Sequence, residues 1–151
     1  MNEHISTLTQ EIAALCQQQT RYKALLAIPG VEPLIAAAFL SEVNAGQFNN
    51  GRQLSAWCGL IPRQNSSGGK TMLSSMTKNG NRGLRTLIIQ GARAVIRFVQ
   101  KRNDGLGRWL TGVIERRGKM KATVALANKL TRIVWRLLVE PVGFNMNKAF
   151  K

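Results

Sequence analysis

Residues 79–102 carry the sequence feature that most restricts the fold, a long apolar stripe at helical spacing. The stripe residues recur at intervals of three, four and seven: Leu84, Leu87, Ile88, Ala92, Val95, Ile96 and Val99. This spacing places them on one face of an α-helix, and Asn79 or Asn81 is a suitable N-cap. Because the chain contains no convincing period-2 strand pattern, we predict an all-α fold.

A second stripe predicts a long helix over residues 119–139. Its apolar residues are Val124, Ala127, Leu130, Val134, Leu137 and Leu138. Lys129, Arg132 and Arg136 lie on another face of this predicted helix. Shorter helices are expected at residues 107–117 and up to Trp57, the latter capped by Asn49 or Asn50.

The N-terminal residues 3–26 predict an amphipathic, coiled-coil-like helix. Its stripe begins with Ile5, Leu8, Ile12 and Leu15. Such a stripe pairs with a second copy, with a segment of a larger protein, or with its own domain. We therefore divide the chain into this helix (1–26), a compact helical domain (27–140) and a loose tail (141–151).

Residues 25–43 predict two apolar helices joined by the tight turn Pro29-Gly30, with Pro33 in the first turn of the second helix. This arrangement resembles a helix-hairpin-helix motif, which grips phosphate through backbone N–H groups. Glu32 occupies the place of the usual second glycine, and its carboxylate would repel phosphate. DNA contact and simple packing both remain open for this hairpin.

Charge is distributed unevenly along the chain, whose formal net charge is +15. Residues 1–60 hold three basic residues and four glutamates, whereas residues 61–151 hold nineteen basic and three acidic residues. A field of this size favours polyanionic partners, chiefly nucleic acid. We expect the binding surface in the second part of the chain.

The rest of the sequence argues against a metal site, a membrane span and a signal peptide. Cys16 and Cys58 show no metal-binding spacing, and His4 has no ligand partners nearby in the sequence. The cysteines are therefore interpreted as buried residues in a reducing compartment. Neither a membrane span nor a signal peptide is apparent, so we expect a cytoplasmic protein with no membrane partner.

The stretch from Gly59 to Arg85 concentrates glycine, serine, asparagine and basic residues, with Asn65-Ser66-Ser67-Gly68-Gly69-Lys70 at its centre. Glycines let backbone N–H groups approach an anion closely, and Lys70 can neutralise a phosphate. A serine beside such a site can attack phosphorus if it is activated. Taken alone, a Ser-Gly pattern is more often only a turn, and the Walker A spacing is absent.

The order of the motifs resembles one known family. An Ile-Pro-Gly hairpin precedes Phe48, Leu54, Trp57-Cys58-Gly59-Leu60, Pro62-Arg63-Gln64, Ser67-Gly68, Thr77-Lys78-Asn79-Gly80-Asn81 and Leu84-Arg85. This succession resembles the C-terminal domain of the IS110/IS116/IS902 family of transposases, from about Leu26 to Lys101. The later helices are similar to the family more weakly.

The resemblance implies a role in DNA recombination. Members of this family move insertion sequences, and a guide RNA from the element bridges donor and target DNA. The family's Ser-Gly dipeptide coincides with Ser67-Gly68, which implies that Ser67 forms a 5′-phosphoserine link with DNA, with Ser66 as the alternative. The residues expected to contact nucleic acid are Arg63, Lys70, Lys78, Asn81, Arg82 and Arg85.

The resemblance also implies partners. Family members carry an N-terminal RuvC-like domain with acidic metal-binding residues, and we expect that domain to be missing here. Mg²⁺ is then expected only through the missing domain, with no cofactor or metal in this chain. Residues 3–26 are expected to hold a homo-oligomer together or to contact full-length transposase. The alternative function is a non-catalytic nucleic-acid-binding or regulatory fragment.

Overall fold

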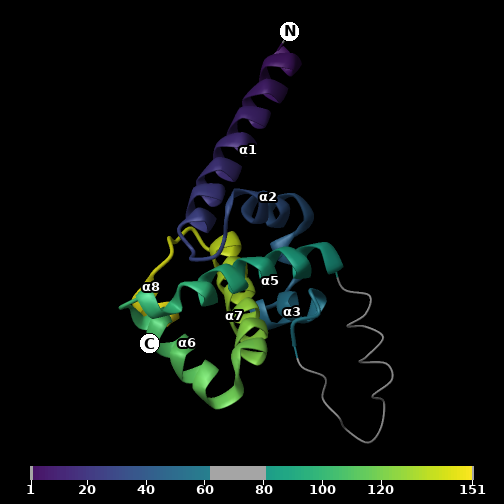
Figure 1. The fold of residues 1–151 in the computed structure, drawn as a ribbon. Helices are drawn as coiled ribbons and strands as arrows, with labels where there is room; N and C mark the ends of the chain where they lie inside the picture. Colours follow the sequence, from purple (N-terminus) through teal and green to yellow (C-terminus); the bar gives the residue numbers. More distant parts are fainter. Residues whose placement is uncertain (1, 62–80, 151) are drawn as a thin grey trace, which may run out of the picture.

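The computed structural model describes residues 2–61 and 81–150, and all regular secondary structure in these two ranges is helical (Figure 1). The helices are α1 (Asn2–Leu26), α2 (Pro33–Glu42), α3 (Gly51–Trp57), α5 (Arg82–Arg97), α6 (Gly105–Arg117), α7 (Lys119–Val139) and α8 (Met146–Ala149). Two 3₁₀ turns, η1 (Ala45–Gln47) and η2 (Val99–Lys101), complete the set. The predicted all-α class is therefore confirmed.

Helix α7 forms the centre of the body and contacts α1, α3, α5 and α6. Leu126, Leu130 and Val134 are fully buried along it. The predicted stripe is wrong at Val124, which is 38% exposed. The neighbouring helices instead cover the side of α7 that carries Ala122 and Thr123, next to Leu126.

A very close approach between two segments occurs where the Pro29-Gly30 turn meets α5. Gly30 has φ +86°, a conformation that favours glycine. A Cβ atom added to Gly91 would collide with the carbonyl oxygen of Gly30. The turn therefore packs against α5 at a distance that only glycine at position 91 permits.

Two element boundaries differ from the sequence prediction. Helix α5 ends at Arg97 instead of continuing to residue 102, because the chain tightens into the 3₁₀ turn η2. Helix α6 begins at Gly105, two residues earlier than expected, because the Asp104 side chain accepts a hydrogen bond from the Gly107 N–H group and caps the helix.

The C-terminal segment contains a short helix and a buried aromatic residue. Residues 146–149 form α8, and the Phe150 side chain is only 2% exposed. The Phe150 ring lies 5.7 Å from that of Trp109, and the ammonium of Lys129 lies 4.8 Å from both ring centroids. These aromatic and cation–π contacts hold the segment against α6 and α7.

Helix α1 extends away from the body (Figure 1). Its last turns pack against α2 and α7, with Leu25 fully buried and Tyr22 half-buried. Leu8, Ile12 and Leu15 are 46%, 61% and 63% exposed. None of the described helices is long and apolar enough to cross a membrane.

Candidate nucleic-acid interface

The serine-rich segment falls in residues 62–80, outside the described part of the chain. The predicted nucleophile Ser67, its alternative Ser66, and the basic residues Arg63, Lys70 and Lys78 all lie there. The structure therefore describes only the residues that flank this segment, up to Ile61 on one side and from Asn81 on the other.

Asn81 connects α2, α3 and α5 through hydrogen bonds. Its backbone N–H donates to the Trp57 carbonyl at the end of α3 (3.0 Å). Its Oδ1 accepts from the Leu84 N–H (3.0 Å) and caps α5, while its Nδ2 donates to Glu42 Oε2 at the end of α2 (3.0 Å). Asn81 thus positions the first turn of α5, and both ends of its amide are engaged within the protein.

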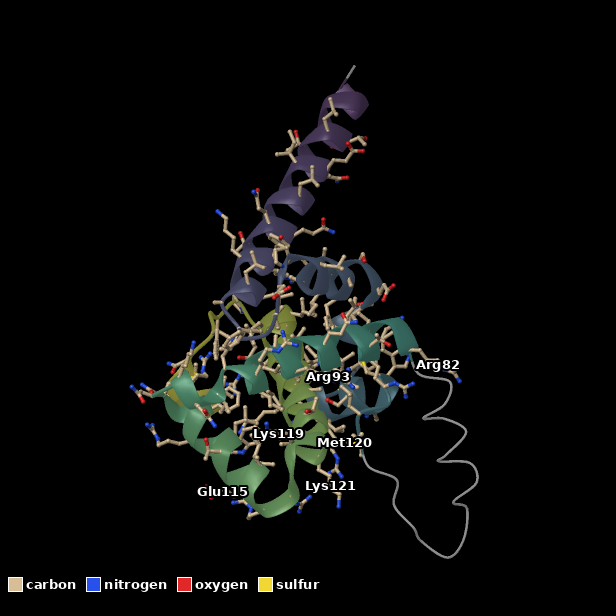
Figure 2. The ribbon with its side chains drawn as sticks, viewed as in Figure 1. Arg82, Arg93, Glu115, Lys119, Met120 and Lys121 are labelled. Carbon is tan, nitrogen blue, oxygen red and sulfur yellow. The ribbon has the colours of Figure 1, made fainter. Side chains whose placement is uncertain are left out.

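The first turn of α5 presents two arginines beside this junction. Arg82 is exposed and Arg85 is half-buried. Figure 2 shows Arg82 at the start of α5 and Arg93 farther along the same helix. Neither Arg82 nor Arg85 forms an ion pair within residues 2–61 and 81–150. No carboxylate of the described ranges therefore neutralises these guanidinium groups, whose paired N–H donors are suited to an anion.

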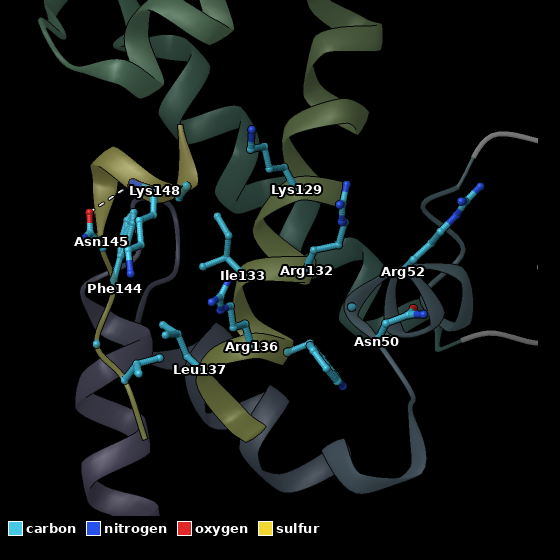
Figure 3. A pocket seen from close by; sticks show the side chains of 15 residues that line it. Asn50, Arg52, Lys129, Arg132, Ile133, Arg136, Leu137, Phe144, Asn145 and Lys148 are labelled. Carbon is cyan, nitrogen blue, oxygen red and sulfur yellow. Dashed lines mark hydrogen bonds between the residues drawn. The ribbon is translucent and has the colours of Figure 1, made fainter. Parts of the chain in front are cut away.

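A second cationic surface lies on another side of the body. It is a groove of about 700 Å³ between α7, the start of α3 and the C-terminal segment (Figure 3). Arg52, Lys129 and Arg132 contribute basic side chains to it. The sequence placed Lys129 and Arg132 on a polar face of their helix, but the groove itself depends on segments far apart in the chain.

Among the described residues, Cys58 has a pKa that its surroundings shift strongly. Burial raises the pKa of its thiol to about 12, and the nearby charge of Glu42 adds to the effect. The thiol therefore stays protonated and packs as a small apolar residue in the core. A thiol that stays protonated is an unsuitable nucleophile.

Acidic residues are sparse around both surfaces. Within the described ranges, no group of three or more His, Cys, Asp or Glu side chains is arranged to hold a metal ion. Only the Arg102–Asp104 and Arg136–Glu140 ion pairs form in the part of the chain that the structure describes. Most of the described basic side chains thus have no carboxylate partner there.

Comparison with protein families matches residues 22–105 to the model described as "Transposase IS116/IS110/IS902 family". The chain is 43% identical over 139 residues to a probable family 20 transposase of Pseudomonas aeruginosa, and 44% identical over 138 residues to the transposase for insertion sequence element IS1111A of Coxiella burnetii. Each match covers 91% of this chain.

The chain covers only 41% and 38% of the lengths of these two relatives. A transposase for insertion sequence element IS1328 of Yersinia enterocolitica is 31% identical over 95% of the chain and 43% of its own length. No solved structure matches. The similarity therefore extends over almost all of this chain and about two fifths of its relatives.

Proposed function

Because the chain belongs to the IS116/IS110/IS902 family of transposases, we propose that it is the DNA-binding C-terminal part of an insertion-sequence transposase and supplies the serine nucleophile. The family match carries this proposal, since it runs from residue 22 to residue 105 and includes the serine segment with both of its flanking helix ends. The relatives' printed names support the same class.

Ser67 is proposed to act by direct attack on a DNA phosphodiester. A bond forms between its Oγ and phosphorus while the bond from phosphorus to the 3′ oxygen breaks. The departing 3′ oxygen gains a proton and the serine loses one, so that a 5′-phosphoserine link and a free 3′ hydroxyl result. A serine hydroxyl is a weak nucleophile, so the step requires activation and stabilisation of the charge on phosphorus.

Arg82 and Arg85 are proposed to hold the DNA backbone beside that serine. The junction at Asn81 anchors the helix that carries both arginines. Arginine binds phosphate through paired N–H donors, which orients the backbone as well as attracting it. A phosphodiester gripped at the start of α5 is thereby presented to the segment that precedes the helix in sequence.

A covalent-adduct assay tests the nucleophile. The chain is combined with the acidic RuvC-like part of such a transposase, a guide RNA and substrate DNA, and protein–DNA adducts are separated under denaturing conditions. We expect Ser67→Ala to abolish the adduct and Ser66→Ala, the matched control, to preserve it. The reverse result would assign the role to Ser66, and an adduct in the double variant would exclude both serines.

The alternative function, a non-catalytic nucleic-acid-binding or regulatory fragment, is favoured by the many described cations without a carboxylate partner. In that case binding depends on the arginines but not on the serine. Arg82→Gln/Arg85→Gln should lower the salt dependence of duplex binding by about two units, roughly 0.9 for each lost phosphate contact. The absence of any adduct with the complete set of components, alongside this change, would favour the alternative.

A further inference from the structure

The groove beside α7 combines three separate stretches of the chain. Arg52 comes from the start of α3, Lys129 and Arg132 from α7, and Phe144 and Lys148 from the C-terminal segment (Figure 3). Helix α3 lies so close to α7 that a Cβ atom added to Gly51 would be 3.0 Å from the Cα atom of Arg132. The backbones of α3 and α7 are therefore in close contact on this side of the groove.

The charged residues that line the groove are all basic. Its lining includes five basic residues and no acidic one: Arg52, Lys129, Arg132, Arg136 and Lys148. Arg136 is partly neutralised by Glu140, at 3.4 Å, whereas the other four form no ion pair within the described ranges. Burial and, second, the charge of Arg132 lower the pKa of Lys129. An anion bound between these side chains would relieve their repulsion.

The floor of the groove is apolar and aromatic. Ile133 and Leu137 of α7 line the groove, and Phe144 of the C-terminal segment faces them from the other side (Figure 3). Trp135 also contributes, and its Nε1 donates a hydrogen bond to the Ala45 carbonyl (3.3 Å), which fixes the ring. Aromatic faces beside a line of cations suit flat bases joined by phosphates.

We propose that this groove binds a single strand of nucleic acid. A duplex would offer phosphates to the basic rim but would keep its base faces stacked, leaving the apolar floor unused. A single strand can use both, because its bases are free to stack on aromatic side chains while its phosphates meet the cations. The groove residues differ from Ser67, Arg82 and Arg85, so this site does not depend on the proposed serine chemistry.

The position of α3 relates this groove to the junction at Asn81. Its first residues border the groove, and its last residue, Trp57, accepts the hydrogen bond from Asn81. A seven-residue helix spans about 10 Å, at ~1.5 Å per residue. A strand bound in the groove would therefore lie about the length of α3 from Asn81, where the helix that carries Arg82 and Arg85 begins.

Fluorescence anisotropy with labelled oligonucleotides tests the site in the 151-residue chain. The probes are single-stranded oligo-dT, single-stranded oligo-rU and a duplex, each ~12 nucleotides long to match typical site sizes. We expect Arg52→Gln/Arg132→Gln to weaken single-strand binding on the order of 10- to 30-fold near ~0.1 M salt, because two phosphate contacts lower the salt slope by about 1.4. Both side chains are exposed, so the fold should be unaffected.

A matched control removes the same charge elsewhere. Arg116→Gln/Arg117→Gln changes two exposed arginines at the end of α6 that do not line the groove. We expect this control to change single-strand affinity less than threefold, roughly the effect of unspecific charge alone. Equal losses in the two double variants would overturn the proposal, since binding would then follow net charge and not the groove.

A third variant tests stacking. Phe144→Leu keeps an apolar side chain against the core but removes the aromatic face, and we expect roughly tenfold weaker single-strand binding with duplex binding unchanged. Duplex affinity that falls as far as single-strand affinity in the groove variants would overturn the single-strand assignment. Whichever of oligo-dT and oligo-rU shows the larger loss identifies the strand as DNA or RNA.

Discussion

Helices α1 and α7 are the two longest in the described structure and both carry apolar residues at helical spacing, yet only one is covered. Leu126, Leu130 and Val134 of α7 are fully buried, whereas Leu8, Ile12 and Leu15 of α1 are each about half exposed. Four helices surround α7, while α1 meets α2 and α7 only near its C-terminal end.

An apolar stripe in the sequence therefore predicts a helix but not which surface packs against that helix. Spacing of three and four residues creates an apolar face, and the face lowers the free energy only when another surface removes it from water. For α7 that surface is within the same chain. For α1 the stripe remains available, and pairing through residues 3–26 with a second copy or a full-length transposase stays a prediction.

Truncating one leucine in each helix measures this difference directly. Leu130→Ala should lower the free energy of unfolding by about 2–5 kcal/mol, because it leaves a cavity in the core. Leu15→Ala should change it by less than about 0.5 kcal/mol. Both are measured by urea unfolding followed by circular dichroism.

A large loss of unfolding free energy in Leu15→Ala that depends on protein concentration would contradict this difference between α1 and α7. It would mean that a second copy covers the α1 stripe in solution, since stability gained through association depends on protein concentration. Light scattering on the same samples would then report a dimer.

Enlarging a residue in the body tests how tightly its helices pack. Gly91→Ala should destabilise the protein by about 1–3 kcal/mol, because the new methyl group would collide with the Gly30 carbonyl. Gly83→Ala, in the first turn of the same helix, is the matched control. The added Cβ would be 3.4 Å from the nearest side-chain atom, so we expect no loss or a slight gain in melting temperature.

Substitution of Asn81 should lower the free energy of unfolding less than truncation of a core residue, but more than substitution on the surface of α1. Asn81→Ala should cost about 1–2 kcal/mol, since it removes the cap of α5 and the bond to Glu42. Asn81→Ser should recover part of this loss by restoring the cap. Gln19→Ala, on exposed α1, should stay within about 0.5 kcal/mol in the same unfolding assay. Equal effects at positions 81 and 19 would contradict the anchoring role.

The smallest expected effect concerns acid stability. Hydrogen bonds from Arg102 lower the pKa of Asp104 below its ordinary value of 3.8, against the opposing effect of burial. A lowered pKa in the folded state stabilises the fold above that ordinary value, and the contribution is lost as the pH falls through the folded pKa.

Because the pair is partly exposed, this contribution should be about 1 kcal/mol or less. Asp104→Asn keeps an acceptor for the Gly107 N–H but removes the titrating group. We therefore expect a flatter curve of unfolding free energy against pH on the acid side. An unchanged curve in this variant would show that Asp104 contributes nothing to acid sensitivity.

The parts of the fold that could be predicted are those that depend on neighbouring residues. The sequence indicated α1 and α7 to within a residue of their observed ends. It left the caps open between Asn49 and Asn50 and between Asn79 and Asn81, and the structure has Asn50 and Asn81. Helical spacing and capping act over one or two turns, so they are present in any local stretch of sequence. The family resemblance likewise follows from an ordered set of local motifs, and the family match confirms it.

The features that the sequence did not predict involve residues far apart in the chain. The burial of Phe150, the contact of Gly30 with Gly91 and the exposure of Val124 depend on which helices lie beside one another. The basic groove joins residues 50–52, 129–137 and 142–149, and no one of these stretches forms a concave surface by itself. Helical segments, the distribution of charge and the family could thus be inferred from the amino-acid sequence. Packing around α7 decided which charged and apolar faces meet, because burial is a property of the assembled chain.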